Sequence, residues 1–466
     1  MAGTLDFWAD NVSIPIVIGW NGVSANGSLR LTAESERPTA RIFVYNTHMK
    51  ITKLLIIVWV VSLFLPTIFV NAQQWDRFRG PNGSGVSLES KLPTEWQEED
   101  YEWKVELAGA GSSSPVVWGD KLFILSTTPE AAIHLQCLDL ESGDENWKTV
   151  FNSAAYKIHA QNSFASSTPA VDAEHVYITY ANPESTMLVA LDHNGEEVWK
   201  RNFGAWVSQH GFAVSPQVYG ELVIFFNSQQ ASRLKPGQTP GKSEMIAVNR
   251  NAGEDVWRCP LTATRSCYGM PAIYEAEGET SQLLGCNTGD GFFSIDLQTG
   301  EKNWSKSVFP KRSVASTLIA NGMVFGSSGS GGGGNALVAG KVKEDGVKKV
   351  YEINRSANYV PSPIAVGGML FLFGDRGVVS CLDLETGEEH WRQRVGRSFS
   401  GSPVATATHL YCIDAKGTCY VIRAASEFDL VSSIDLGEVS RSTPTIVGDR
   451  LLLRTDRHLI SLQGSE

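Results

Sequence analysis

The sequence predicts an all-β protein, an eight-bladed β-propeller made of four-stranded repeats. A short step, usually a small residue followed by proline, recurs eight times at intervals of about 40–55 residues, which is the length of one propeller blade. Short apolar runs follow each step, and most repeats end in a glycine-containing turn and an aromatic residue. The composition, with 44 Gly, 19 Pro and 19% charged residues, favours many short strands and tight turns over surface helices.

Each blade is expected to begin at this recurring step, which leads into the strand nearest the propeller axis. The eight steps are Ser114-Pro115, Thr168-Pro169, Ser215-Pro216, Met270-Pro271, Ser316-Thr317, Ser362-Pro363, Ser402-Pro403 and Thr443-Pro444.

The sixth repeat shows the expected order of strands within a blade. Three apolar runs, 364–366, 369–373 and 378–382, are separated by turns that contain glycine. A further turn at Glu385-Thr386-Gly387 leads to an outer strand that contains Trp391.

Tryptophan recurs on the outer strand, and Tyr351 takes its place in the fifth repeat. Because the position recurs regularly, we expect these rings to pack between neighbouring blades rather than to stack on a ligand. The docking tryptophans are Trp103, Trp147, Trp199, Trp257, Trp304 and Trp391.

The two ends of the chain are expected to close the ring together. Too few residues follow Pro444 to form four strands. Trp103 stands as far before Pro115 as Trp391 stands before Pro403, which gives residues 102–107 the register of an outer strand. The sequence therefore predicts that 102–107 completes the last blade beside 459–462, so that no sheet edge is left open at the junction.

The N-terminal part has the pattern of a secretory signal. Lys50 and Lys53 precede an uncharged apolar run at 54–70, and small residues follow before Gln73. We therefore expect 1–48 to be an upstream extension from a misplaced start codon, and 49–72 to be a signal peptide. Residues 73–101 are then an N-terminal lead-in and 102–466 the propeller. The protein is expected to be exported, either periplasmic or secreted. An uncleaved signal that serves as a membrane anchor is the alternative.

The chain has seven cysteines, and in an oxidising compartment this odd number leaves at least one free thiol. Cys259 with Cys267, and Cys412 with Cys419, are near enough in sequence to pair. The sequence leaves both pairings open.

The repeats carry a family resemblance. Tails such as Leu-Asp-Leu-Glu-Thr-Gly-Glu-Glu-His-Trp, at 382–391, resemble the tryptophan-docking repeats of PQQ-dependent quinoprotein dehydrogenases. They also resemble the propeller lipoprotein of the outer-membrane barrel-assembly machinery. Two stretches, 75–85 and 162–169, are similar to exported PQQ-like propeller proteins of planctomycete-type bacteria. The resemblance covers about 75–466 and implies the fold, whereas one fold can host unrelated functions.

Three functions remain open from the sequence. We favour a non-catalytic binding or scaffold propeller for an anionic ligand or an envelope protein partner. A PQQ-dependent oxidoreductase is the first alternative, and it would need PQQ, a calcium cage and a catalytic Asp. The adjacent-cysteine pair that the resemblance implies for such enzymes is missing, as is any haem-attaching C-x-x-C-H. A cell-envelope or outer-membrane assembly factor is the second alternative, although no lipid-anchoring cysteine follows the apolar run. We predict no catalytic residue, no metal site and no cofactor other than, under the first alternative, PQQ with calcium.

The loops that enter the inner strands should meet at one mouth of the central channel, and Glu438 is the only acid in all eight. This charge pattern predicts a positive funnel for an anion, although basic loops can also be plain solvated surface. The candidate ligand-binding residues are Lys157, His159, Asn162, Trp206, His210, Arg265, Tyr268, Lys311, Arg312, Tyr359, Arg397 and Arg441.

The expected partner is an anionic small molecule, a glycan or a segment of an envelope protein. A net charge of −11 argues against nucleic acid. We expect a monomer that contacts a membrane only through an uncleaved signal. The glycine run at 329–334 lacks a following helix or lysine, so we expect a flexible loop there rather than a phosphate cradle.

Overall fold

The computed structural model describes residues 3–9, 12–18, 74–275, 278 and 280–464. The chain divides into two compact units, Met1–Val70 and Asn71–Glu466. The described part of the first unit is an antiparallel hairpin of β1 (Gly3–Ala9) and β2 (Val12–Ile18). The predicted signal peptide at 49–72 lies outside the described residues.

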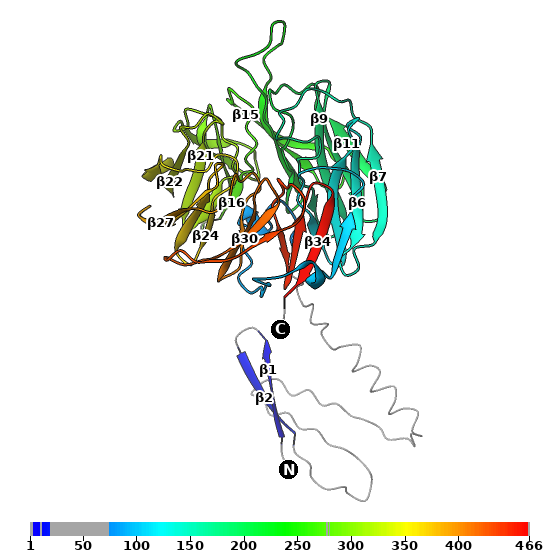
Figure 1. Cartoon of the computed structure of the whole chain (residues 1–466), viewed down its shortest axis with the longest axis vertical. Helices are drawn as coiled ribbons and strands as arrows, with labels where there is room; N and C mark the ends of the chain where they lie inside the picture. Colours follow the sequence, from blue (N-terminus) through cyan, green and yellow to red (C-terminus); the bar gives the residue numbers. More distant parts are fainter. Residues whose placement is uncertain (1–2, 10–11, 19–73, 276–277, 279, 465–466) are drawn as a thin grey trace, which may run out of the picture. The chain divides into compact units, whose positions relative to one another are not determined.

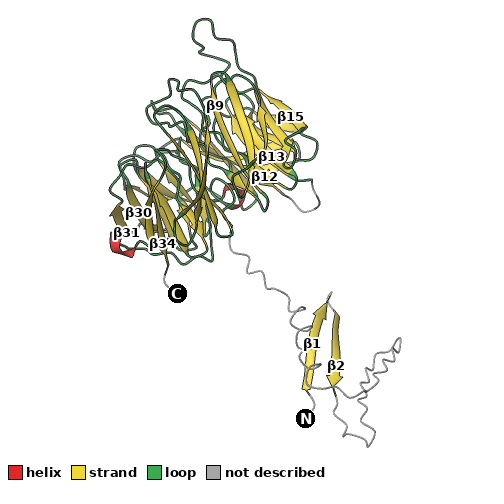
Figure 2. Cartoon of the chain, turned by 90° about the vertical axis from the view of Figure 1, so that its right-hand side faces the viewer, coloured by secondary structure: helices red, strands yellow, loops and turns green. Residues whose placement is uncertain are grey.

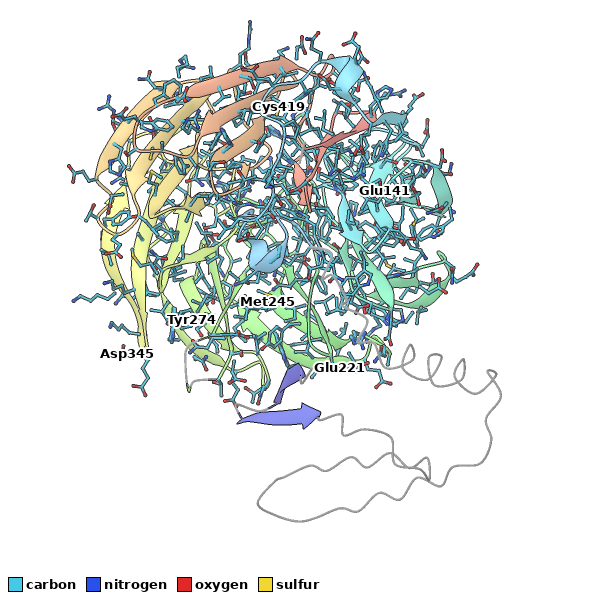
Figure 3. All side chains as sticks on the ribbon, turned by 90° about the horizontal axis from the view of Figure 1, so that it is seen from below. Glu141, Glu221, Met245, Tyr274, Asp345 and Cys419 are labelled. Carbon is cyan, nitrogen blue, oxygen red and sulfur yellow. The ribbon has the colours of Figure 1, made fainter. Side chains whose placement is uncertain are left out.

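The second unit contains eight four-stranded antiparallel sheets, so the eight-bladed propeller is confirmed (Figures 1 and 2). Seen from below, the blades stand around a common centre (Figure 3). Two short 3-10 helices, η1 (Pro81–Gly83) and η2 (Glu98–Asp100), precede the first blade.

The first four blades each run from the inner strand to the outer strand in chain order. Blade 1 is β4 (Val116–Trp118), β5 (Lys121–Thr127), β6 (Ile133–Asp139) and β7 (Glu145–Phe151). Blade 2 is β8 (Ala170–Val171), β9 (His175–Asn182), β10 (Ser185–Asp192) and β11 (Glu197–Asn202). Blade 3 is β12 (Gln217–Tyr219), β13 (Leu222–Asn227), β14 (Ser243–Asn249) and β15 (Asp255–Leu261). Blade 4 is β16 (Ala272–Tyr274), β17 (Gln282–Asn287), β18 (Gly291–Asp296) and β19 (Lys302–Lys306).

The remaining blades follow the same order, except that the last one borrows its outer strand. Blade 5 is β20 (Leu318–Ala320), β21 (Met323–Ser328), β22 (Ala336–Lys343) and β23 (Gly346–Ile353). Blade 6 is β24 (Ile364–Val366), β25 (Met369–Phe373), β26 (Val378–Asp383) and β27 (Glu389–Arg394). Blade 7 is β28 (Val404–Ala405), β29 (His409–Ile413), β30 (Thr418–Arg423) and β31 (Leu430–Asp435). Blade 8 is β32 (Thr445–Val447), β33 (Arg450–Arg454), β34 (His458–Gln463) and β3 (Trp103–Glu106).

The predicted closure between the chain ends is confirmed. β3 pairs antiparallel with β34, with Trp103 opposite Ser461 and Val105 opposite Leu459. Strands from the start and the end of the propeller therefore share one sheet, and the ring has no open edge at the junction.

Hydroxyl groups join the inner ends of the blades at seven of the eight junctions, the exception being the step into blade 4, where Met270 stands. We call this set the hydroxyl ring. The backbone N–H of Ser362, for example, donates to Ser402 Oγ at 2.9 Å in the next blade. The ring closes across the chain ends, where Thr443 N–H donates to Ser114 Oγ at 3.3 Å. Equivalent bonds start from Ser114, Thr168, Met270, Ser316 and Ser402. The Ser or Thr that begins seven of the eight steps therefore satisfies a buried backbone donor of the preceding blade, and a small residue without a hydroxyl group could not do this.

The docking tryptophans pack against the turn of the next blade. Trp199 Nε1 donates to the carbonyl of Arg250 at 2.9 Å, and its ring covers Gly253, where a Cβ would lie 2.6 Å from the indole. The same donation occurs from Trp103, Trp147, Trp257 and Trp391, and Tyr351 replaces it with its hydroxyl. Trp304 is 8% exposed, and its Nε1 has no partner among the described residues. The repeated Gly thus leaves room for the ring of the preceding blade.

The segment predicted as a lead-in belongs to the propeller unit and crosses the channel. Its backbone accepts from Val117 of blade 1 and from Val171 of blade 2. Two buried arginines continue across, with Arg77 Nη2 donating to Pro271 O at 3.3 Å and Arg79 Nη2 to Pro363 O at 2.9 Å. Gly85 O then accepts from blade 7. We call residues 75–87 the crossing segment; its η1 turn lies near the centre of the ring in Figure 3.

All seven cysteines are buried and free, so neither of the pairings left open by the sequence is formed. Within the described residues, no helix is long and apolar enough to cross a membrane.

Candidate functional site

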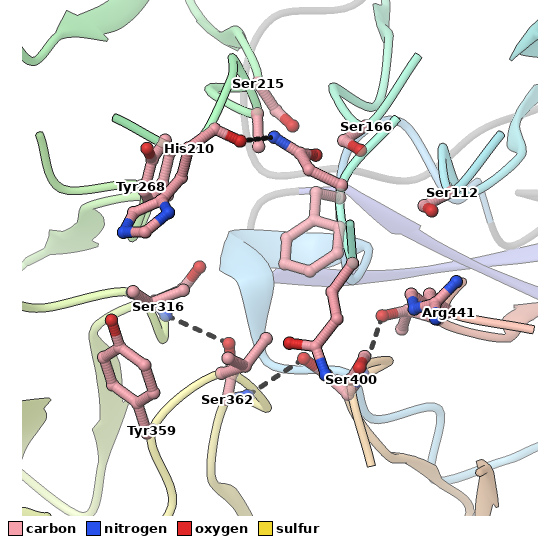
Figure 4. A pocket seen from close by; sticks show the side chains of 18 of the residues that line it. Ser112, Ser166, His210, Ser215, Tyr268, Ser316, Tyr359, Ser362, Ser400 and Arg441 are labelled. Atoms are coloured by element: carbon pink, nitrogen blue, oxygen red, sulfur yellow. Dashed lines mark hydrogen bonds between the residues drawn. The ribbon is translucent and has the colours of Figure 1, made fainter. Parts of the chain in front are cut away.

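A pocket of about 280 Å³ lies at the channel mouth where the entering loops meet (Figure 4). Seven of the residues proposed from the sequence line it: His159, Asn162, His210, Tyr268, Arg312, Tyr359 and Arg441. Phe78 of the crossing segment also lines it, so a residue that the sequence placed in a lead-in contributes to the pocket wall.

The other five candidates do not line the pocket. Trp206 is 4% exposed and packs edge-on against Phe212 at 5.1 Å, so it contributes to the core. Lys311 Nζ donates to the carbonyls of Gly333 and Gly334 at 2.7 and 3.0 Å. Arg265 is half-buried, whereas Lys157 and Arg397 are exposed on the surrounding surface. A sequence shows which loop a side chain belongs to, but not the direction in which it points.

Arg312 is the most unusual residue in the pocket. It is only 3% exposed, yet its Nε and Nη2 have no hydrogen-bond partner among the described residues. Its guanidinium lies 6.0 Å from the centre of the Tyr268 ring. Tyr359 makes a side-chain hydrogen bond with Arg312, but the two unpartnered nitrogens still carry a desolvation cost that an acceptor in the pocket would offset. Arg441 resembles it in one respect, because its Nε is also buried and unpartnered among those residues.

The two histidines lie edge to face, with ring centres 5.0 Å apart. Asn162 Nδ2 donates to the carbonyl of His210 at 2.8 Å and holds the two entering loops together (Figure 4). Burial and, after it, the positive charge of Arg312 lower the pKa of His210 to about 4. His210 is therefore neutral at pH 7 and does not add to the positive charge that was expected of these loops.

The hydroxyl ring supplies further donors to the pocket. Each ring hydroxyl accepts a backbone N–H, so its own O–H hydrogen remains available to donate. The ring hydroxyls that line the pocket belong to Ser215, Ser316, Ser362, Ser402 and Thr443. Together with the two guanidinium groups, they make a lining that is rich in donors.

The channel mouth is less positive than the entering loops alone suggest. The turns between the second and third strands of two blades bring aspartates next to these loops. Asp375 accepts from Tyr359 N–H and Val360 N–H at 2.9 and 3.0 Å, and Asp414 accepts from Arg397 N–H at 3.1 Å. These aspartates follow second strands and lie outside the entering loops, so the charge pattern of those loops does not include them. They cap backbone donors and lie outside the pocket lining, in which the described residues include no carboxylate.

The glycine run also differs from its predicted role as a free loop. Gly329 N–H donates to Arg312 O at 2.9 Å, and Ser330 Oγ donates to Gly333 O at 3.0 Å. Gly331 lines the pocket. The run is therefore one wall of the site, held close to Arg312.

The lining does not fit PQQ with calcium. Calcium needs several carboxylate or carbonyl oxygens, and the enzymes of this kind need a catalytic Asp. Arginine, histidine, tyrosine and hydroxyl groups dominate the pocket instead. Throughout the described residues, no group of three or more His, Cys, Asp or Glu could hold a metal ion.

Fold and pocket define a class: a closed eight-bladed propeller whose channel is crossed by its own N-terminal segment and whose mouth holds a donor-lined pocket. The family model described as outer membrane protein assembly factor BamB matches residues 134–371 and 355–465. This chain belongs to that PQQ-like propeller family, as the repeats indicated.

Solved structures support the fold alone. BamB from Moraxella catarrhalis is 15% identical, with a TM-score of 0.55 over 78% of this chain and 96% of that chain. Quinohemoprotein alcohol dehydrogenase from Comamonas testosteroni is 12% identical, with a TM-score of 0.59 over 85% of this chain and 82% of that chain. The computationally designed Ika8 protein is 10% identical, with a TM-score of 0.53 over 77% and 98% of the two chains. The search of curated proteins finds no match.

Proposed function

We propose that this protein is an exported, non-catalytic binding propeller whose mouth pocket holds an anionic group. The observation that supports this most directly is Arg312, a cation that is 3% exposed and keeps two unpartnered nitrogens within the described residues. A carboxylate or similar oxyanion would accept from these nitrogens and offset the cost of burying the charge.

Export is supported by the signal pattern at 49–72 and by the family, whose described member belongs to outer-membrane assembly. An oxyanion is favoured over a neutral ligand because the hydroxyl groups and the guanidinium of Arg441 are also donors. The pocket is small enough that one acidic group and its immediate substituents would fill it.

Calorimetric titration with galacturonate tests the proposal. Wild-type protein should bind it, and binding should weaken when salt rises from about 20 mM to about 200 mM. Arg312→Gln keeps most of the side-chain volume but removes the charge, and should lower the affinity at least about tenfold.

Lys343→Gln is the matched control, because Lys343 is exposed at the end of β22, in the hairpin with β23, and pairs with no acid in the described residues. Equal affinity of Arg312→Gln and wild type, or no binding of galacturonate at low salt, would remove the basis for this function.

The second candidate is an assembly factor that docks envelope proteins. The family match favours it. Deleting the gene should then lower the amount of outer-membrane β-barrel proteins, and the Arg312→Gln variant should restore them if docking does not use the pocket. Unchanged β-barrel levels in the deletion strain would count against this candidate.

A further inference from the structure

A basic arm stands beside the pocket. It is the connection between β13 and β14, residues 228–242, which projects in green at the top of Figure 1. Its charged side chains are Arg233, Lys235 and Lys242, all exposed, and it contains no acid. Like charges gathered on one projecting loop repel each other, so the arrangement suits a surface that meets negative charge.

The base of the arm is fixed to the loops that form the pocket. Ala231 N–H and Ser232 N–H donate to Thr264 O at 3.1 and 3.0 Å. Gln209 links the two sides, because its Nε2 donates to Arg233 O at 3.0 Å and its Oε1 accepts from Arg265 Nη2 at 3.0 Å.

The loop that carries Gln209 and the loop that carries Arg265 also lead into the pocket. Ser208 Oγ lies 2.9 Å from the hydroxyl oxygen of Tyr268, a lining residue, and accepts from His210 N–H at 3.2 Å. Burial and then the charges of Arg312 and Arg233 lower the pKa of Arg265, so these three basic side chains lie near one another between the base of the arm and the pocket.

We propose that the pocket and the arm together bind the end of an acidic glycan, with a terminal uronate sugar in the pocket and the following uronates along the arm. This rests on the proposed function and extends it from a single anionic group to a chain.

The chemistry of the lining favours a glycan over an acidic peptide. A peptide brings backbone N–H donors that need acceptors, whereas the pocket offers mainly donors from arginine and hydroxyl groups. Carboxylate, ring and glycosidic oxygens of a uronate chain only accept, and its hydroxyl groups can accept as well as donate, unlike the backbone N–H groups of a peptide. Tyr268 and Phe78 add ring surface against which the apolar face of a sugar can pack.

Titration with galacturonate and with hexagalacturonate separates the chain proposal from the pocket proposal. Wild-type protein should bind the hexamer about tenfold more tightly than the monomer, with a steeper dependence on salt, because several charges meet the arm. The triple variant Arg233→Ser, Lys235→Ser and Lys242→Ser should lose this gain and bind the monomer as wild type does. The hydrogen bonds at the arm base use backbone carbonyls, so these substitutions leave them in place.

The matched control is Lys341→Ser, Lys343→Ser and Lys348→Ser, which removes the same charge from exposed positions on the β22–β23 hairpin. It should keep the preference for the hexamer. Binding of the monomer without any gain for the hexamer would overturn the chain proposal and leave the pocket function standing. Equal affinity for hexaglutamate would overturn the glycan class. Failure of the monomer and the hexamer alike would contradict both proposals.

Discussion

His210 is held in its neutral form by its surroundings. Its pKa falls from 6.5 to about 4, first through burial and then through the charge of Arg312. The unfolded chain therefore takes up a proton near pH 6.5, whereas the folded protein resists it until about pH 4. The stability that neutral His210 provides is complete above pH 6.5 and is lost as the pH falls toward 4.

We expect the free energy of unfolding to drop by about 1–2 kcal/mol between pH 6.5 and pH 4.5 because of this residue, after allowance for solvent screening. Denaturant unfolding at several pH values should show a shallower decline for His210→Gln than for wild type. Parallel curves for the two proteins would mean that His210 titrates normally in the folded state.

The sequence indicated seven of the residues that line the pocket, but not how deeply each side chain is buried or what it contacts. Arg312 is one of twelve equivalent candidates until its burial is known, and its side chain bonds to Tyr359, which belongs to a different entering loop. Trp206 shows the reverse case, because its side chain turns into the core although its loop reaches the mouth. Side-chain direction depends on packing between blades, which no local pattern contains.

The turns that receive the docking rings are the clearest elements for a stability test. Gly253 and Gly220 both have positive φ, 68° and 53°, but only at Gly253 would a Cβ meet the ring of Trp199. Gly220→Ala should cost about 1 kcal/mol from backbone strain alone. Gly253→Ala should cost about 2–4 kcal/mol, because the indole must also move.

Urea denaturation of the two variants measures the difference. If both variants lose the same stability, the ring is not held against the turn and the repeated Gly serves only the backbone.

The strands themselves were predictable because apolar runs and turns alternate regularly. The crossing segment was not, since 75–87 carries no strand pattern and is held in place by carbonyls of distant blades.

For the molecule as a whole, the junction between β3 and β34 distinguishes closure from ordinary blade packing. Trp103 and Trp391 make the same contact with the next blade, through Leu140 O and Ala425 O. Each change to Ala should cost about 3–5 kcal/mol. β3, which carries Trp103, is far in sequence from β34, so no hairpin turn holds it in its sheet. Only Trp103→Ala therefore loosens a strand of this kind.

Hydrogen exchange of backbone amides in β34 should therefore accelerate in Trp103→Ala and stay near the wild-type rate in Trp391→Ala. Similar rates in both variants would show that closure does not depend on the docking ring.

The closure could be predicted because strand register is visible in the spacing of tryptophan and proline. The hydroxyl ring is also visible in the sequence, because most of the steps that begin a blade start with Ser or Thr, whose hydroxyl oxygen can accept a backbone N–H.

The shared last blade also has a consequence for the order of events during synthesis. Glu102 pairs with Arg450, 348 residues further along the chain, and the crossing segment needs carbonyls of blades 4 and 6. The contact between Glu102 and Arg450 can form only when nearly all of the chain is available, and the crossing segment must wait for blades 4 and 6. Such distant contacts form slowly. Until then, the apolar faces of unpaired blades are exposed, which favours aggregation of the incompletely folded chain. The first residues of the propeller are among the last to reach their final positions.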